Sequence, residues 1–172
     1  GYIYAKSGSE TLIKYADISE MGTSTDNKYG VSFISIDGSI ANSGLTIDKS
    51  RIHDGYYGIY ATSSSNNNTG NSKGISNTAI YGNSSNGIYL GSNSNNNTLT
   101  SNSIYGNNGY GIYLASSFNN TLTSNQSYRN SQYGIYLYSS SNNNTLTSNQ
   151  TYGNGRSFEN WEGIYLVSSS NN

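Results

Sequence analysis

Apolar residues alternate with polar residues or tyrosines in short runs along most of the chain. In residues 112–114 two aliphatic side chains flank a tyrosine, and Leu99 stands between Thr98 and Thr100. A period of two residues is typical of a strand, whereas a helix needs apolar residues three and four positions apart. The runs in between consist of Asn, Ser and Gly, which tolerate left-handed turns. The pattern predicts many short strands and no helix.

The strands recur in copies of one unit. Gly-Ile-Tyr occurs at positions 58, 87, 111, 134 and 163, and Gly30-Val31-Ser32 is a weaker copy, so the spacings are 28, 29, 24, 23 and 29 residues. The coils are expected at 1–29, 30–57, 58–86, 87–110, 111–133 and 134–162, followed by a partial coil at 163–172. We predict a single domain, residues 1–172, of about six coils that forms part of a longer polypeptide.

A unit of 23 to 29 residues cannot bury its apolar side alone, so it must stack on copies of itself and form an all-β solenoid. Stacking predicts two apolar ladders inside the solenoid. One contains Ile59, Ile88, Ile112, Ile135 and Ile164, and the other contains Ile47, Ile75, Leu99, Leu122 and Leu146.

Asparagines recur at a turn that directly follows a strand. Asn102, Asn125 and Asn149 are expected to form a structural ladder in which the amide of one coil bonds to the next. Ser50 and Ala16 occupy the same row in earlier coils, so we expect the ladder to weaken toward the amino end.

Charge and composition exclude several classes of partner. The net charge is -1 and 10% of residues are charged, without the Lys and Arg clusters that nucleic acid requires. No apolar run approaches the roughly 20 residues of a membrane helix, so no membrane insertion is expected. A mean hydropathy of -0.63 is typical of disordered chains, but the fixed aliphatic positions favour an ordered repeat.

The strings G-I-Y-L and N-N-T-L-T-S-N resemble the right-handed parallel β-helix repeats of the NosD-like and pectate-lyase-like superfamily. The resemblance covers residues 30–172 well and 1–29 loosely, and the Ser/Asn-rich form is similar to repeats of archaeal cell-surface proteins. It implies an all-β right-handed parallel β-helix. Because this fold hosts many unrelated activities, it implies less about function.

If the chain resembled the polysaccharide lyases and hydrolases of this fold in function, the resemblance would imply clustered carboxylates, often with Ca²⁺, and an Arg or Lys base. Between Gly74 and Gly155 the only charged side chain is Arg129, so no enzymatic activity is expected. Two ionisable clusters are interpreted as a solvated coil face and a surface loop, with catalysis or binding as the alternative. The first contains Asp48, Lys49, Arg51, His53 and Asp54, and the second contains Arg156, Glu159 and Glu162 beside Trp161.

The resemblance to NosD would imply a role with copper, which needs His, Cys or Met ligands. The chain offers His53 and Met21 only. We therefore predict no metal site and no cofactor.

Outward positions of the first strand of each coil hold tyrosines. These rings either shield the backbone by stacking on one another or form a platform for sugar rings or a neighbouring subunit. This possible contact ladder consists of Tyr60, Tyr89, Tyr113, Tyr136 and Tyr165.

Thr-Leu-Thr recurs at residues 98–100, 121–123 and 145–147, with both hydroxyls expected to face outward. The rows resemble the Thr-X-Thr arrays of ice-binding β-helices, although Thr is also an ordinary strand residue. Ice binding is a remote alternative.

N-X-S/T sequons are expected on a glycosylated extracellular surface. The candidate sites are Asn67, Asn83, Asn96, Asn119 and Asn143, while the sequons at Asn125 and Asn149 belong to the expected ladder.

We therefore expect an extracellular structural protein of the cell surface that assembles into a filament, sheath or layer. Residues 2–5 resemble the strand that begins at Gly163, so head-to-tail contact through strand edges is expected beside lateral association. The alternative is a carbohydrate-binding or carbohydrate-processing β-helix that uses the tyrosine ladder or residues 48–54, with glycans as partners.

Overall fold

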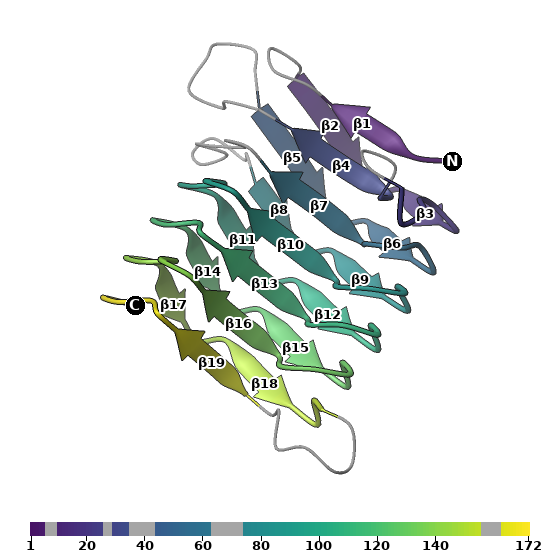
Figure 1. Ribbon diagram of the computed structural model, residues 1–172. Helices are drawn as coiled ribbons and strands as arrows, with labels where there is room; N and C mark the ends of the chain where they lie inside the picture. Colours follow the sequence, from purple (N-terminus) through teal and green to yellow (C-terminus); the bar gives the residue numbers. More distant parts are fainter. Residues whose placement is uncertain (6–9, 26–28, 35–43, 63–73, 156–162) are drawn as a thin grey trace.

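The computed structural model describes residues 1–5, 10–25, 29–34, 44–62, 74–155 and 163–172. Over these ranges the chain winds through three parallel sheets, and strands of successive coils lie side by side (Figure 1). The described residues contain no helix, and hence none with the length and apolarity to cross a bilayer. The expected all-β parallel β-helix is confirmed.

The first sheet has seven strands, and the second and third have six each. The first sheet consists of β1 (Ile3–Ala5), β4 (Val31–Ile34), β7 (Ile59–Thr62), β10 (Ile88–Gly91), β13 (Ile112–Ala115), β16 (Ile135–Tyr138) and β19 (Ile164–Val167). The second consists of β2 (Glu10–Lys14), β5 (Gly44–Asp48), β8 (Gly74–Ser76), β11 (Thr98–Thr100), β14 (Thr121–Thr123) and β17 (Thr145–Thr147). The third consists of β3 (Asp17–Ser19), β6 (Arg51–His53), β9 (Ala79–Tyr81), β12 (Ser103–Tyr105), β15 (Gln126–Tyr128) and β18 (Gln150–Tyr152).

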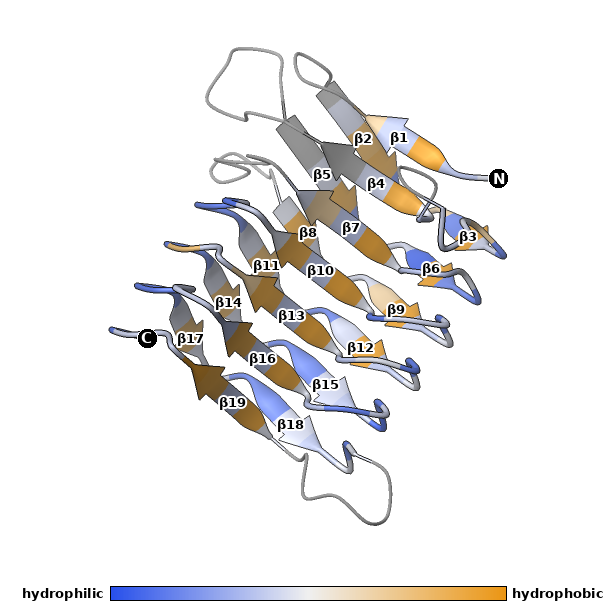
Figure 2. Ribbon diagram, in the orientation of Figure 1, coloured by the Kyte–Doolittle hydropathy of each residue, from blue (hydrophilic) through white to orange (hydrophobic). Residues whose placement is uncertain are grey.

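Equivalent residues of successive coils pair in register, so inward positions form columns of like side chains. The column on the first sheet is Ile59, Ile88, Ile112, Ile135 and Ile164. The column on the second is Ile47, Ile75, Leu99, Leu122 and Leu146. All but Ile164 and Leu146 are almost fully buried, and Figure 2 shows the apolar positions of the first sheet as aligned bands. Both apolar ladders are confirmed.

The inward column of the third sheet changes character along the solenoid. It holds isoleucines through Ile104 in β12 and then continues with Ser127 and Thr151, so β15 and β18 are pale or blue in Figure 2. Ser127 is buried, and its hydroxyl donates to the carbonyl of Gly134 at 2.7 Å. The hydrogen bond offsets the cost of burying this hydroxyl.

Close packing between coils requires the glycine that opens the G-I-Y-L units at Gly87, Gly111 and Gly134. A Cβ on Gly87 would lie 2.8 Å from the carbonyl oxygen of Gly111 and closer still to the side chain of Ile104. A backbone oxygen of the next coil cannot move without breaking the ladder of hydrogen bonds. The repeated glycine therefore marks a place where two coils approach closely.

One residue with positive φ turns the chain from the second sheet to the third. Ser101 and Ser124 both have φ 55°, and Ser148 has φ 54°. An inward asparagine follows each of these serines. A single left-handed residue thus produces the sharp turn and aims the following amide into the solenoid.

The structure places the three expected asparagines in a hydrogen-bonded ladder. Asn102 donates through Nδ2 to Asn125 Oδ1 at 3.0 Å and to the Ile75 carbonyl at 2.8 Å, and Asn125 repeats the pattern with Asn149 at 3.0 Å. Toward the amino end the row continues with a shorter side chain. The backbone amide of Ala16 donates a hydrogen bond to Ser50 Oγ at 3.2 Å.

Two further asparagine ladders run along other turns. Each links consecutive coils through amide-to-amide bonds of 2.8 to 3.3 Å. One contains Asn83, Asn107, Asn130 and Asn154, and the other contains Asn97, Asn120, Asn144 and Asn172. The polar composition of the chain therefore serves its interior as well as its surface.

Candidate functional site

Most charged side chains of the described residues lie in the first two coils, and one group of them meets on the third sheet. Asp17 on β3 pairs in register with Arg51 on β6, and His53 lies two residues further along the same strand. Strand alternation turns Ile52 inward and leaves its two neighbours on the outer face. The turn after β6 supplies Asp54, so four ionisable groups meet at one place.

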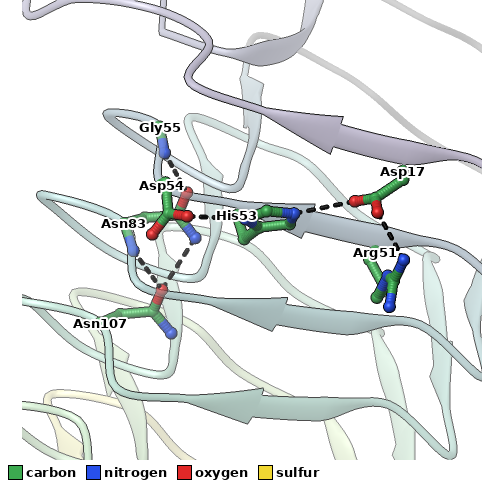
Figure 3. A network of polar contacts seen from close by, with 7 residues as sticks. All are labelled: Asp17, Arg51, His53, Asp54, Gly55, Asn83 and Asn107. Carbon is green, nitrogen blue, oxygen red and sulfur yellow. Dashed lines mark hydrogen bonds and ion pairs between the residues drawn. The ribbon is translucent and has the colours of Figure 1, made fainter.

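His53 lies between two carboxylates (Figure 3). Its Nε2 is 2.8 Å from Asp17 Oδ1, and its Nδ1 is 2.8 Å from Asp54 Oδ2. The other oxygen of Asp17 accepts a hydrogen bond from Arg51. The adjacent Gly55 amide donates to Asn83 Oδ1 at 3.0 Å, which ties this cluster to an asparagine ladder.

The hydrogen bonds set the charge of this cluster. The hydrogen bond with Asp54 is the main cause that raises the pKa of His53, and the bond with Asp17 adds to it. The hydrogen bond with His53 is the main cause that lowers the pKa of Asp17, and the bond from Arg51 adds to it. An imidazolium donates through both nitrogens, so it satisfies both carboxylates at once. Because the carboxylates are about half exposed, these ion pairs add little to global stability.

The charge state of His53 gives a pH prediction. Its raised pKa means that its contribution to stability is complete below the ordinary value of 6.5 and is lost as the pH rises through the raised value. His53 is the only histidine, so its NMR titration is unambiguous. We expect a midpoint above 6.5 that falls in Asp54→Asn. A wild-type midpoint at or below 6.5 would show that the carboxylates do not hold the proton.

Beyond His53, the outer face of the third sheet carries a continuous stripe of aromatic rings. His53 stacks on Tyr81 with ring centres 4.6 Å apart and planes 3° from parallel. Tyr81, Tyr105, Tyr128 and Tyr152 then follow at 4.8, 5.0 and 4.9 Å, all within 9° of parallel. We call His53 and these four tyrosines the third-sheet ring stripe.

A parallel stack covers the faces of its inner rings and presents their edges and hydroxyl groups to solvent. Beside the ring stripe runs a second outward column, which pairs in register as Ala79, Ser103, Gln126 and Gln150. The two glutamines are exposed, and Ser103 Oγ lies 3.4 Å from the Tyr128 hydroxyl. The face therefore offers a tyrosine hydroxyl in each of four coils and a glutamine amide in the last two, and it ends at the Asp17–Arg51–His53 cluster.

The tyrosines expected on the first sheet do line one outer face, but in a different arrangement. Neighbouring rings lie 5.0 to 5.6 Å apart, and the Tyr89–Tyr113 pair is tilted by 64°. Tyr110, from the preceding turn, packs 4.9 Å from Tyr113 and 4.8 Å from Tyr136. Burial among these rings raises the pKa of Tyr113 to about 12. Tyr60, Tyr89, Tyr113 and Tyr136 are half-buried, and Tyr165 is exposed. This face is self-packed.

The sequons fall into three groups. Asn96 is half-buried and Asn119 and Asn143 are exposed, at equivalent turn positions with positive φ, so glycosylation there stays a prediction. Asn83 is 1% exposed and donates to Asn107 Oδ1 at 2.8 Å. The prediction of a glycan at Asn83 is therefore corrected, because its side-chain amide is hydrogen-bonded within a buried ladder. Asn67 lies outside the described residues.

The other sequence candidates separate in space. Asp48 ends β5 on the second sheet, Lys49 lies in the turn that leads to β6, and Arg51 and His53 lie on the third sheet, so the expected cluster of residues 48–54 divides between two sheets. The second expected cluster, at residues 156–162, lies outside the described residues. The Thr-Leu-Thr rows pair in register over three coils with their leucines inward. No group of three or more His, Cys, Asp or Glu side chains suited to a metal occurs among the described residues.

Over residues 1–172 the chain belongs to the family described as right handed beta helix region, which confirms the expected handedness. No curated protein matches the chain in sequence.

Among solved structures, the chain is similar to the periplasmic alginate epimerase AlgG, with a TM-score of 0.60 and 20% identity over 86% of this chain and 41% of that chain. A mutant of that enzyme gives a TM-score of 0.60 and 21% identity over 98% and 44%. The chain spans less than half the length of these structures. At 20% and 21% identity, the similarity to these structures shows a shared fold and nothing more.

Proposed function

We propose that this β-helix binds an extended carbohydrate along the outer face of its third sheet, outside the cytoplasm. The observation that carries the proposal is the third-sheet ring stripe, which runs beside exposed amides and ends at a polar cluster. The fold is also that of a periplasmic enzyme whose name refers to alginate, a carbohydrate.

The face has the chemistry that a sugar polymer requires. Tyrosine edges supply apolar contact together with a hydroxyl, and glutamine side chains both donate and accept hydrogen bonds. Because coils repeat at about 4.8 Å, these groups form a regular row that suits a ligand with repeating hydroxyls. Their order within a rigid sheet limits the conformational entropy lost on binding.

The geometry favours binding over catalysis. A general base must have a nitrogen or oxygen within reach of the substrate proton. Both nitrogens of His53 are engaged by carboxylates at 2.8 Å, and the hydrogen bonds with Asp54 and Asp17 raise the pKa of the ring. Release of product from a polysaccharide that disappears in His53→Ala would overturn this part of the proposal.

A glycan array followed by calorimetry tests the proposal. We expect Tyr105→Ala to weaken binding of the best glycan at least about tenfold, as loss of a central aromatic contact does elsewhere. Tyr113→Ala is the matched control, because it removes a tyrosine from the self-packed first sheet. Equal losses in both variants, or loss in Tyr113→Ala alone, would place the ligand elsewhere.

A structural rod of the cell surface that associates with its own copies is the second candidate. Exposed aromatic groups favour it, because Phe118 and Tyr138 are 38% and 42% exposed outside the ring stripe. Electron microscopy of native material distinguishes the two candidates. Ordered filaments or layers would favour the structural role, whereas dispersed particles would count against it.

A further inference from the structure

A charged pocket lies on the second sheet, across the turn from the third-sheet ring stripe. It has a volume of about 270 Å³ and is lined by Lys14, Thr46, Asp48, Lys49, Ser76 and Asn77. Lys14, Asp48 and Ser76 pair in register as one outward column of β2, β5 and β8. The next residues along the chain after Asp48 and Ser76 supply Lys49 and Asn77. Three coils therefore build this pocket, which we call the lysine pocket.

The carboxylate in the lysine pocket is held in place. Ser76 Oγ and Asn77 Nδ2 each donate to Asp48 Oδ1 at 2.9 Å. The hydrogen bond from Asn77, followed by that from Ser76, lowers the pKa of Asp48, so the group is ionised. Both bonds end on the same oxygen, which leaves Oδ2 able to accept a hydrogen bond from a ligand hydroxyl.

One of the two ammonium groups is also positioned by the fold. Lys49 Nζ lies 3.4 Å from the Tyr15 hydroxyl and 5.4 Å from the centre of that ring. A cation over a tyrosine ring is attracted by the π electrons, which limits its range of positions. With Lys14, the pocket offers two positive charges against the single negative charge of Asp48.

We propose that the lysine pocket is a subsite for one sugar residue that carries an anionic substituent, a carboxylate or a sulfate. The substituent lies between the ammonium groups of Lys14 and Lys49, and a ring hydroxyl donates to Asp48. The volume suits one sugar ring, because pockets for larger ligands start at about 300 Å³. This inference rests on the proposed function, since it names the class of glycan that the β-helix binds.

The position of the pocket fits a ligand shared with the ring stripe. The turn between β5 and β6 consists of Lys49 and Ser50, so Asp48 and Arg51 stand on its two sides. A glycan bound beside His53 can thus place its end residue in the lysine pocket by crossing one two-residue turn. The tyrosines and glutamines of the third sheet then contact the neutral part of the glycan.

Calorimetry at low ionic strength tests the subsite with three probes of one length. These are a glucuronate oligosaccharide, its carboxyl-reduced neutral counterpart and a sulfated counterpart. We expect the wild type to bind an acidic probe about fivefold or more tightly than the neutral one. The double variant Lys14→Gln/Lys49→Gln is expected to bring this preference within about twofold, with neutral binding unchanged. Both lysines are exposed, so folding is preserved.

Arg129→Gln is the matched control, because it removes an exposed positive charge from the turn after β15, which is distant from the lysine pocket. It is expected to leave the preference intact. The carboxylate and sulfate probes show which substituent the pocket takes. Equal wild-type affinity for all three probes, or a preference that survives the double variant, overturns the subsite while the proposed function stands. Absence of binding to any glycan overturns the proposed function itself, and the subsite with it.

Discussion

Replacing Asn125 with alanine is expected to destabilise the protein by about 3 kcal/mol or more, because three buried polar groups each lose a hydrogen bond. Asn125 Oδ1 accepts from both the backbone amide and Nδ2 of Asn102, at 3.1 and 3.0 Å. Its own Nδ2 donates to the Leu99 carbonyl at 2.9 Å. Each hydrogen bond that alanine removes from these buried groups costs about 1–3 kcal/mol before relaxation.

Chemical denaturation followed by circular dichroism measures this effect. Asn108→Ala is the matched control, since Asn108 is exposed in a nearby turn and accepts a long hydrogen bond of 3.4 Å from Ser131. It is expected to change the free energy of unfolding by no more than about 0.5 kcal/mol. A loss at Asn125 no larger than that at Asn108 would mean that the ladder contributes shape but little stability.

Leu114→Ala is expected to lower the free energy of unfolding by about 2–5 kcal/mol. Leu114 is fully buried and pairs in register with Leu90 and Leu137. The leucines above and below are fixed by the strand ladder, so the coil cannot collapse into the space that the side chain leaves. In a solenoid each coil contacts mainly its neighbours, and the loss therefore weakens two coil interfaces.

The same denaturation measurement tests this core prediction. Leu114→Met keeps the volume and is expected to cost less than about 1.5 kcal/mol. If both substitutions destabilise the protein equally, the shape of the leucine matters more than its volume. If neither does, the inward column is not the core that supports the fold.

The repeat made the fold and its apolar ladders predictable from the sequence. Residues such as Ile112 and Leu122 recur at fixed places in each unit, so stacking in register follows once a unit cannot bury its own apolar side. The same argument applied to the turn of Asn102. The burial of Asn107 and Asn120 does not follow from the sequence, although both belong to repeated strings, because a polar run between strands is ordinarily exposed.

The candidate site was less predictable, for two physical reasons. The string Tyr-X-Asn recurs at Tyr81, Tyr105, Tyr128 and Tyr152. It does not show that the four rings stack in parallel, because the strands that precede it differ, as Ala-Ile-Tyr81 and Gln-Ser-Tyr128 do. One of the two carboxylates that hold His53 comes from Asp17, 36 residues earlier in the least regular part of the repeat. Its register with β6 follows from the folded coil, and the local sequence does not specify it.

The most direct test of carbohydrate binding on the third sheet is NMR mapping of the glycan that binds most tightly on the array. Titration is expected to shift the signals of Tyr105, Tyr128, Gln126 and Gln150, and to leave those of Tyr89 and Tyr113 on the first sheet unchanged. Shifts confined to the first sheet, or no saturable shift with any glycan, would contradict the account.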